Sequence, residues 1–354
     1  MGTNLLIVVA TLALQSPQQD TSADTSTAHG VGFERLSDLL QYNRVQGLSL
    51  GAGYRVRLPG TLTANAYGTL RYGLSDDRVT GRIAIRGNVG GGRLALSGYH
   101  DIADLDPFSP GRSMANTING LFAGHDNGDY ALARGGSASF EMPIRAGVEL
   151  ILTGRVERLT SVRRVARSAV NDFLGGTGLF PPNPLVDEGT FTGGSARVRG
   201  VGTTRWNLTA DVLGGDGRTI GRVYGDVGRR IGSGLGITLR LKAGAATEPA
   251  LPQTFFRLGG LGTVRGFEYG TLRGPAFWAA QLDITPFGAR VRPVIFLDAG
   301  QASQISRLFS TSALVGGGVG LSLFSGLIRF DLSRPVSPDQ SGKVRFDLVV
   351  QGVR

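Results

Sequence analysis

Residues 236–244 read GITLRLKAG, and apolar and polar side chains alternate along them without a break. The apolar residues are Ile237, Leu239 and Leu241, and the polar residues are Thr238, Arg240 and Lys242. Successive side chains of a β-strand point to opposite faces. The stretch therefore predicts a strand with one apolar face and one polar, charged face.

The same alternation recurs from Val45 to the end of the chain, for example in RWNLTADVL (205–213), GLIRFDLSR (326–334) and KVRFDLVVQG (343–352). Most of these segments are long enough for a tilted bilayer crossing, which takes about 9–11 residues. Their polar faces carry charges of both signs at mid-strand, as in the wet lumen of a membrane barrel. The pattern predicts fifteen strands, at 45–57, 61–73, 78–88, 91–101, 130–142, 145–158, 189–201, 203–214, 218–229, 235–246, 274–286, 290–301, 313–323, 326–334 and 343–352.

We therefore expect an all-β fold, a transmembrane antiparallel β-barrel, with a soluble β-sandwich or β-helix as the alternatives. Short turns on one side and long loops on the other are typical of outer-membrane barrels, whose short side is periplasmic. The predicted turns are tight at 58–61, 88–91, 142–145 and 324–326, and the loops are long at 101–129 and 160–188. Single-chain bacterial barrels have an even number of strands. We therefore expect sixteen, the first lying before Val45, although FERLSDLLQYNR (33–44) looks more like a short amphipathic helix than a strand.

Composition excludes several classes of site. Without cysteine, the chain has no disulfide, thiolate metal site or cysteine nucleophile. His29, His100 and His125 lack the spacing of metal ligands, so we expect no metal and no cofactor. The net charge of +10 raises the question of nucleic acid. The arginines recur singly inside strands rather than in one run, so we expect a basic surface or lumen and no nucleic-acid partner.

The N-terminal segment, residues 1–30, is predicted to be an export signal or a disordered segment, followed by one outer-membrane barrel domain over 31–354. Leu5 to Leu14 is an apolar run followed by polar residues, which is the shape of an export signal. No Lys or Arg precedes the run and no clean cleavage site follows it. The alternatives are a wrongly assigned start residue or a fragment whose upstream domain is missing.

A second feature is the loop-like stretch GTVRGFEYG (262–270), which presents one arginine between Val264 and Gly266. Val264–Phe267 resembles the V/I-R-G-F/Y signature of the sixth extracellular loop in the outer-membrane assembly and two-partner secretion barrels. These are the BamA, TamA and FhaC relatives, also called bacterial surface antigen proteins. Residues 296–300, FLDAG, resemble that family's F/G-x-D-x-G pattern on the thirteenth strand. The resemblance covers about 250–354.

The resemblance implies that the loop folds back into the barrel, where Arg265 pairs with Asp298 and locks loop to wall. Alternation turns Phe296, Asp298 and Gly300 to the lumen. Arginine suits this position because its planar fork holds a carboxylate bidentately and keeps its charge. Gly266 permits a tight bend beside it, and Phe267 can pack against the wall or Phe296.

The function that the resemblance implies is insertion or transport of proteins at the outer membrane. A passive pore or structural barrel is the alternative. The partners would be outer-membrane lipid and a client protein or a POTRA-bearing periplasmic partner, because the residues before the barrel are too few for a POTRA module. Two departures stand out. The twelfth strand offers Gln281 and Asp283, neither cleanly aligned with the family's second acid, and the chain ends in VVQGVR without a terminal aromatic.

We do not expect an enzyme. GLSLG at 47–51 satisfies G-x-S-x-G, but a nucleophile elbow needs a strand, a sharp turn and a helix. Ser49 lies inside an alternating strand instead. The sequence offers no Ser/His/Asp set, and Asp76 and Asp77 lie in a predicted turn.

Overall fold

The computed structural model describes residues 29–33, 35–59, 64–232, 235–286, 291–337 and 342–350. Nearly all of the predicted N-terminal segment, 1–30, lies outside them. The strands are β1 (His29–Val31), β2 (Leu40–Asn43), β3 (Gly47–Leu58), β4 (Ala64–Gly73), β5 (Arg78–Val89), β6 (Gly92–Asp104), β7 (Tyr130–Arg145), β8 (Val148–Ser161), β9 (Gly189–Gly200), β10 (Thr204–Gly215), β11 (Arg218–Ile231), β12 (Leu235–Ala246), β13 (Phe256–Leu258), β14 (Leu272–Gly274), β15 (Ala276–Pro286), β16 (Val291–Ser303), β17 (Leu314–Leu323), β18 (Ile328–Pro335) and β19 (Arg345–Val350). The helical elements are η1 (Leu36–Asp38), α2 (Met114–Ile118), η2 (Asn119–Ala123), α3 (Ala169–Phe173), η3 (Pro252–Thr254), η4 (Ile305–Arg307) and η5 (Phe324–Gly326).

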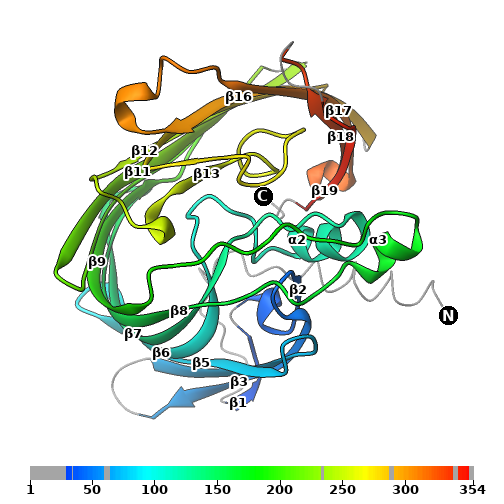
Figure 1. Cartoon of the computed structure of the whole chain (residues 1–354). Helices are drawn as coiled ribbons and strands as arrows, with labels where there is room; N and C mark the ends of the chain where they lie inside the picture. The colour runs from blue at the N-terminus through cyan, green and yellow to red at the C-terminus, as the bar shows by residue number, and fades with distance from the viewer. Residues whose placement is uncertain are drawn as a thin grey trace.

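One antiparallel sheet carries 17 of the strands, and β13 and β14 form a separate two-stranded ribbon. Each strand from β3 to β12 pairs with the next along the chain, β12 pairs with β15, and the pairing continues to β19. Figure 1 shows these strands curving around a central space, the lumen. All fifteen predicted strands are present, so the expectation of an antiparallel barrel is confirmed.

The first strand of the barrel comes in two pieces. β1 pairs with residues 54–56 of β3, and β2 pairs with residues 47–50 of the same strand. The two pieces run in the same direction and share one position, so the 17 strands of the sheet fill sixteen positions. Of the helix suggested for 33–44, the described residues contain only the short η1, because Leu40–Asn43 pair with β3 as the strand β2. A β-carbon at Gly51 of β3 would lie 2.2 Å from the Asp38 carbonyl oxygen, so this glycine makes room for η1.

The two faces of the sheet differ in the way that the alternation predicts. In β16, Ile295 and Leu297 are 61% and 50% exposed, whereas Phe296 and Asp298 between them are 3% and 0% exposed. In β12, Leu239 and Leu241 are likewise exposed. The barrel therefore turns apolar side chains outward and charged side chains inward, as a lipid-facing wall requires. In the described part of the chain, no helix is long and apolar enough to cross a membrane.

The apolar outer surface leads to the first prediction. We expect the protein to fractionate with outer membranes and to migrate differently on gels before and after heating, because the folded barrel resists detergent. A folded monomer that stays soluble without detergent or lipid would contradict this assignment.

Loops on one side of the barrel fill the lumen. The turns at the other end are short, and the 142–145 turn that we expected is instead part of β7, which turns only after Arg145. On the long side, the third loop (105–129) carries α2 and η2, the fourth (162–188) carries α3, and the sixth (247–275) carries η3, β13 and β14. Asn119 in η2 exchanges two 2.7 Å hydrogen bonds with the backbone of Leu348 in β19, and Thr117 in α2 accepts one from Tyr42 of β2. The third loop thus lies inside the barrel, touching both its first and its last strand.

Candidate functional site: the sixth loop and its anchors

The sixth loop runs through the lumen as a compact plug rather than as an open surface loop. Its ribbon of β13 and β14 lies inside the ring of strands in Figure 1. Apolar side chains of the loop and of the barrel wall pack together in one buried cluster. This cluster contains Tyr224, Phe256, Leu258, Val264, Phe267, Phe277, Ala279, Ala302 and Leu314. Apolar burial therefore holds the loop against the wall formed by β11, β15, β16 and β17.

At the tip of the loop, Arg265 meets Asp298 of β16. Its Nη2 donates to Asp298 Oδ1 over 2.6 Å, and its Nε donates to Oδ2 over 2.7 Å. The backbone amide of Arg265 donates to the same Oδ2 over 3.0 Å. The exposed fractions of the two residues are 4% and 0%. The structure thus brings the two residues together as a bidentate, buried ion pair.

Two further carboxylates complete the surroundings of Arg265. Its Nη2 donates to Asp283 Oδ1 of β15 over 2.8 Å, and its Nη1 lies 3.4 Å from Asp331 Oδ2 of β18. Of the two twelfth-strand residues that the sequence offered, Gln281 and Asp283, it is Asp283 that contacts Arg265. Alternation did place Asp331 on a polar face, but nothing in one strand reveals that three separate strands converge on one guanidinium.

Arg329 and Arg240 balance the three acids. Arg329 Nε donates to Asp331 Oδ1 over 2.6 Å and its Nη1 donates to Asp283 Oδ2 over 3.1 Å. Arg240 Nη1 donates to Asp283 Oδ2 over 2.8 Å. Three arginines therefore neutralise three aspartates in one network. We call Arg240, Arg265, Asp283, Asp298, Arg329 and Asp331 the anchor network.

The electrostatics favour a charged Arg265. Burial alone would lower its pKa, but the charge of Asp298, its hydrogen bonds and the charges of Asp283 and Asp331 raise that pKa above its ordinary value. The guanidinium also lies over the ring of Phe296, 3.8 Å from the centroid, where a cation is attracted to the ring face. Phe296 thus contacts Arg265, while Phe267 packs in the apolar cluster.

Three glycines allow the loop and the wall to approach so closely. Gly266 has a φ of +93°, and a β-carbon there would lie 2.6 Å from the Arg334 carbonyl carbon. A β-carbon on Gly316 of β17 would lie 1.9 Å from the Arg265 carbonyl oxygen. At Gly300, it would lie 3.0 Å from Leu258 of the loop. Larger residues at these positions would push the loop tip off the wall.

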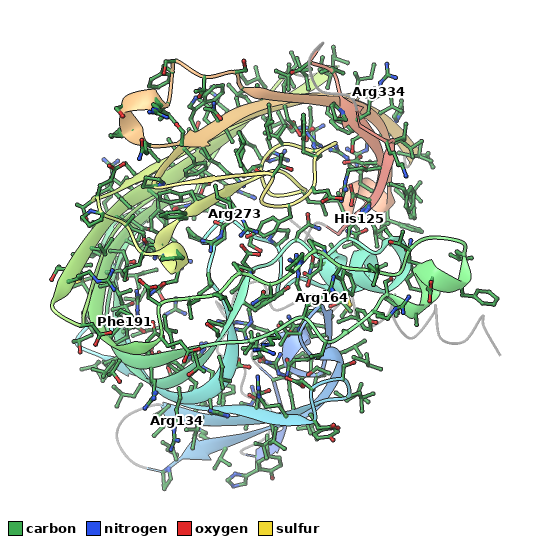
Figure 2. All side chains as sticks on the ribbon, viewed as in Figure 1. His125, Arg134, Arg164, Phe191, Arg273 and Arg334 are labelled. Atoms are coloured by element: carbon green, nitrogen blue, oxygen red, sulfur yellow. The ribbon has the colours of Figure 1, made fainter. Side chains whose placement is uncertain are left out.

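A second ionic cluster holds the base of the loop. Asp129, which directly precedes β7, is fully buried and accepts a 3.0 Å hydrogen bond from Arg257 Nε of β13. Its carboxylate also lies 3.3 Å from Arg273 of β14 and 3.8 Å from Arg44 of the turn after β2. Figure 2 shows Arg273 within the lumen. Asp129 therefore ties the sixth loop to the third loop and to the first turn.

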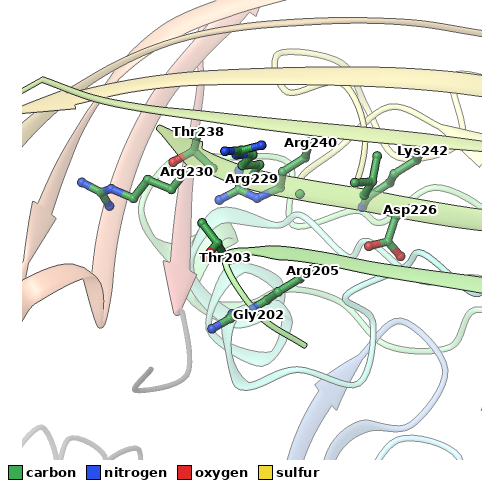
Figure 3. Close-up of a pocket in the computed structure, with 11 residues that line it drawn as sticks. Gly202, Thr203, Arg205, Asp226, Arg229, Arg230, Thr238, Arg240 and Lys242 are labelled. Carbon is green, nitrogen blue, oxygen red and sulfur yellow. The ribbon is translucent and has the colours of Figure 1, made fainter. Parts of the chain in front are cut away.

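A basic cavity of about 230 Å³ lies at the short-turn end of the lumen, between β10, β11 and β12 (Figure 3). Its charged lining residues are Arg205, Asp226, Arg229, Arg230, Arg240 and Lys242. Arg240 belongs both to this lining and to the anchor network. The excess of cations over the single acid favours anionic groups entering from that end.

The residues considered for catalysis take other places. Ser49 lies inside β3, fully buried, where alternation put it. His125 Nδ1 lies 2.9 Å from Asp347 of β19, and in the described part of the chain no hydrogen bond joins His125 to Ser49. Among the described residues, no group of three or more His, Asp or Glu side chains could hold a metal ion.

Two protein-family models match different parts of the chain. Residues 233–323 match a family model described as haemolysin secretion/activation protein ShlB/FhaC/HecB. Residues 18–162 match the C-terminal domain of a family of unknown function, DUF5686. No curated protein sequence matches the chain.

Among solved structures, the chain is similar to BamA from Haemophilus ducreyi lacking POTRA domains 1–3. The TM-score is 0.59 at 13% identity, over 87% of this chain and 68% of that one. It also resembles CdiB from Acinetobacter baumannii and from Escherichia coli, each with a TM-score of 0.47. The identities are 14% and 15%, and 87% of this chain covers 57% and 60% of those chains. The BamA likeness and the apolar exterior together identify the chain as an outer-membrane β-barrel with the BamA fold.

Proposed function

We propose that this barrel helps to insert or transport client proteins at the outer membrane. The proposal rests on the range of residues that the ShlB/FhaC/HecB family model matches. Its range, 233–323, begins before β12 and ends with β17, so it includes the whole sixth loop. Arg265, Asp283 and Asp298 all lie inside this range, together with most of the apolar cluster.

In this proposal the anchor network is a lock between the sixth loop and the wall. Buried ion pairs of this kind are not a strong source of net stability, since the cost of desolvating the charges offsets their attraction. They do favour one geometry over others, because a displaced Arg265 leaves the buried Asp298 without a guanidinium partner, while Asp283 and Asp331 keep only Arg329 and Arg240. The lock therefore holds the plug in one position, with Val264, Gly266, Phe267, Phe296 and Gly300 shaping the contact.

The client would approach from the short-turn end, where the basic cavity lies. A POTRA-bearing protein is the partner that we propose there, since BamA is itself a protein with POTRA domains. The cations of the cavity would favour clients with acidic segments through long-range attraction. Outer-membrane lipid would surround the apolar exterior.

The test uses liposomes that contain the 354-residue protein, with and without a POTRA-bearing protein. An unfolded barrel client is diluted from urea, and its insertion is followed by its heat-dependent shift on a gel. A non-barrel client is scored separately by protection from protease inside the liposomes. We expect a faster appearance of one product with both components than with either alone, and little acceleration by the 354-residue protein alone.

Two variants sharpen this test. Arg265→Ala should slow the reaction, whereas Arg307→Ala, which removes an exposed arginine of η4, should leave it unchanged. If neither client responds to the two components, while BamA liposomes process the barrel client in parallel, the proposed function is wrong.

A further inference from the structure

Two arginines and a histidine form a row on the outer surface of the barrel. Cα register pairs His100 of β6 with Arg134 of β7, and Arg134 with Arg158 of β8. Thr190 of β9 is the next residue in the row, opposite Arg158. All four side chains are exposed. We call these four residues the cationic row.

The row belongs to the lipid-facing side of the wall. Arg158 lies two positions from Val156, and Val156 and Leu152 on the same face of β8 are 51% and 44% exposed. Residues two apart in a strand share a face. Figure 2 shows Arg134 on the outside of the barrel. Because β7 starts at Tyr130, directly after the third loop, Arg134 lies near the long-loop end of the strand. The row therefore marks the level along the barrel at which the exposed side chains of the outer face change from apolar to charged.

Nothing in the described part of the chain neutralises the row. None of the side chains of His100, Arg134 and Arg158 has a hydrogen bond or ion pair there. Arginines on the lumen face of the same region behave differently, since Arg155 pairs with Asp211 over 3.0 Å. Glu188, two residues before Thr190, accepts a hydrogen bond from the Ser161 amide.

This arrangement is unfavourable unless an anion compensates it. Side chains directly opposite on neighbouring strands have β-carbons about 4.5–5.5 Å apart, and like charges in such positions repel. At the edge of the hydrocarbon layer this repulsion is screened less than in open water. A phosphate group would offset this repulsion. Each guanidinium can bind phosphate oxygens bidentately, and the threonine hydroxyl can donate a hydrogen bond to a further phosphate oxygen.

We propose that the cationic row is a binding site for the phosphate of a lipid headgroup in the leaflet at the long-loop end. The acyl chains of that lipid lie along the apolar face below, past Val156 and Leu152. A lipid is favoured over free phosphate because charge and apolar surface adjoin on the same face of the same strands. The inference depends on the barrel and not on its transport function, so either can fail without the other.

The test exploits the absence of cysteine from the sequence. Val156→Cys carries a fluorophore directly below the row, and the protein is placed in bilayers containing brominated lipids that quench on contact. Brominated phosphatidic acid is compared with brominated phosphatidylcholine at equal content. We expect phosphatidic acid to associate roughly thirtyfold more strongly, the order expected for two arginines facing an anionic lipid.

The variants separate a site from general surface charge. Arg134→Gln combined with Arg158→Gln should abolish the preference for phosphatidic acid. Arg57→Gln combined with Arg145→Gln removes two exposed arginines at the short-turn end and should preserve it. Heat-dependent gel mobility checks that each variant is folded. Equal quenching by the two lipids, or an equal loss in both double variants, would overturn the proposal.

Discussion

Arg265→Ala should lower the free energy of unfolding by about 3–5 kcal/mol, the usual effect of removing one partner from a buried ion pair. Asp298 is fully buried and loses both hydrogen bonds from the guanidinium, keeping only the one from the backbone amide of residue 265, and Asp283 and Asp331 lose one each. Arg329 still faces two of the three acids but does not replace the bidentate contact with Asp298. Urea titration of the reconstituted barrel measures the change.

Two companions to this variant test the cause. Arg265→Lys should recover part of the loss, since it restores the charge but not the planar fork. Adding Asp298→Asn to Arg265→Ala should also recover part, because it removes the stranded charge. Arg307→Ala, the exposed control, should change stability by no more than about 0.5 kcal/mol. A loss at Arg265→Ala no larger than at Arg307→Ala would show that the ion pair contributes nothing to the fold.

The second large effect concerns conduction through the lumen. A barrel of sixteen to eighteen strands encloses a water-filled channel unless something fills it. With the third, fourth and sixth loops inside, the intact protein should show small and brief conductance in planar bilayers. Leu258 of β13 and Leu272 of β14 are register partners. Replacing residues 259–271 by Asn-Gly should therefore close a two-residue hairpin and remove the plug tip. The resulting channel should conduct steadily.

The matched control shortens a different loop. Residues 172–176 at the end of α3 are exposed, so their removal should leave conductance at the level of the intact protein. Steady, large conductance from the intact protein would instead favour the passive pore that the sequence left open as an alternative.

The strands were predictable because the alternation that specifies each strand lies within its own segment of the sequence. The alternation of polar with apolar residues along GITLRLKAG specifies both the strand and its lumen face. Arg265 and Asp298 were predictable together because each lies in its own recognisable motif. Asp283, Arg329 and Asp331 have no such motif. Their convergence depends on the register of β12, β15, β16 and β18, which no single strand contains.

The two-piece first strand and the filling of the lumen by loops could not be predicted from the sequence for a related reason. β1 and β2 are too short to show alternation, and it is β3 that lines them up. Asp129 gives no local sign of joining three arginines from three parts of the chain. Long connections could be recognised as loops, but whether they extend into solvent or fill the barrel depends on such distant pairs.

The most direct test of the central claim, that Arg265 holds the sixth loop inside the barrel, is the accessibility of single cysteines in an otherwise cysteine-free chain. Val264 is fully buried, whereas the Glu268 side chain in the same loop is 75% exposed. With a water-soluble maleimide, Glu268→Cys should react quickly and Val264→Cys slowly. Adding Arg265→Ala should make Val264→Cys react quickly, while adding Arg307→Ala should not. Equal reaction of both cysteines in the otherwise unaltered protein would contradict an anchored loop.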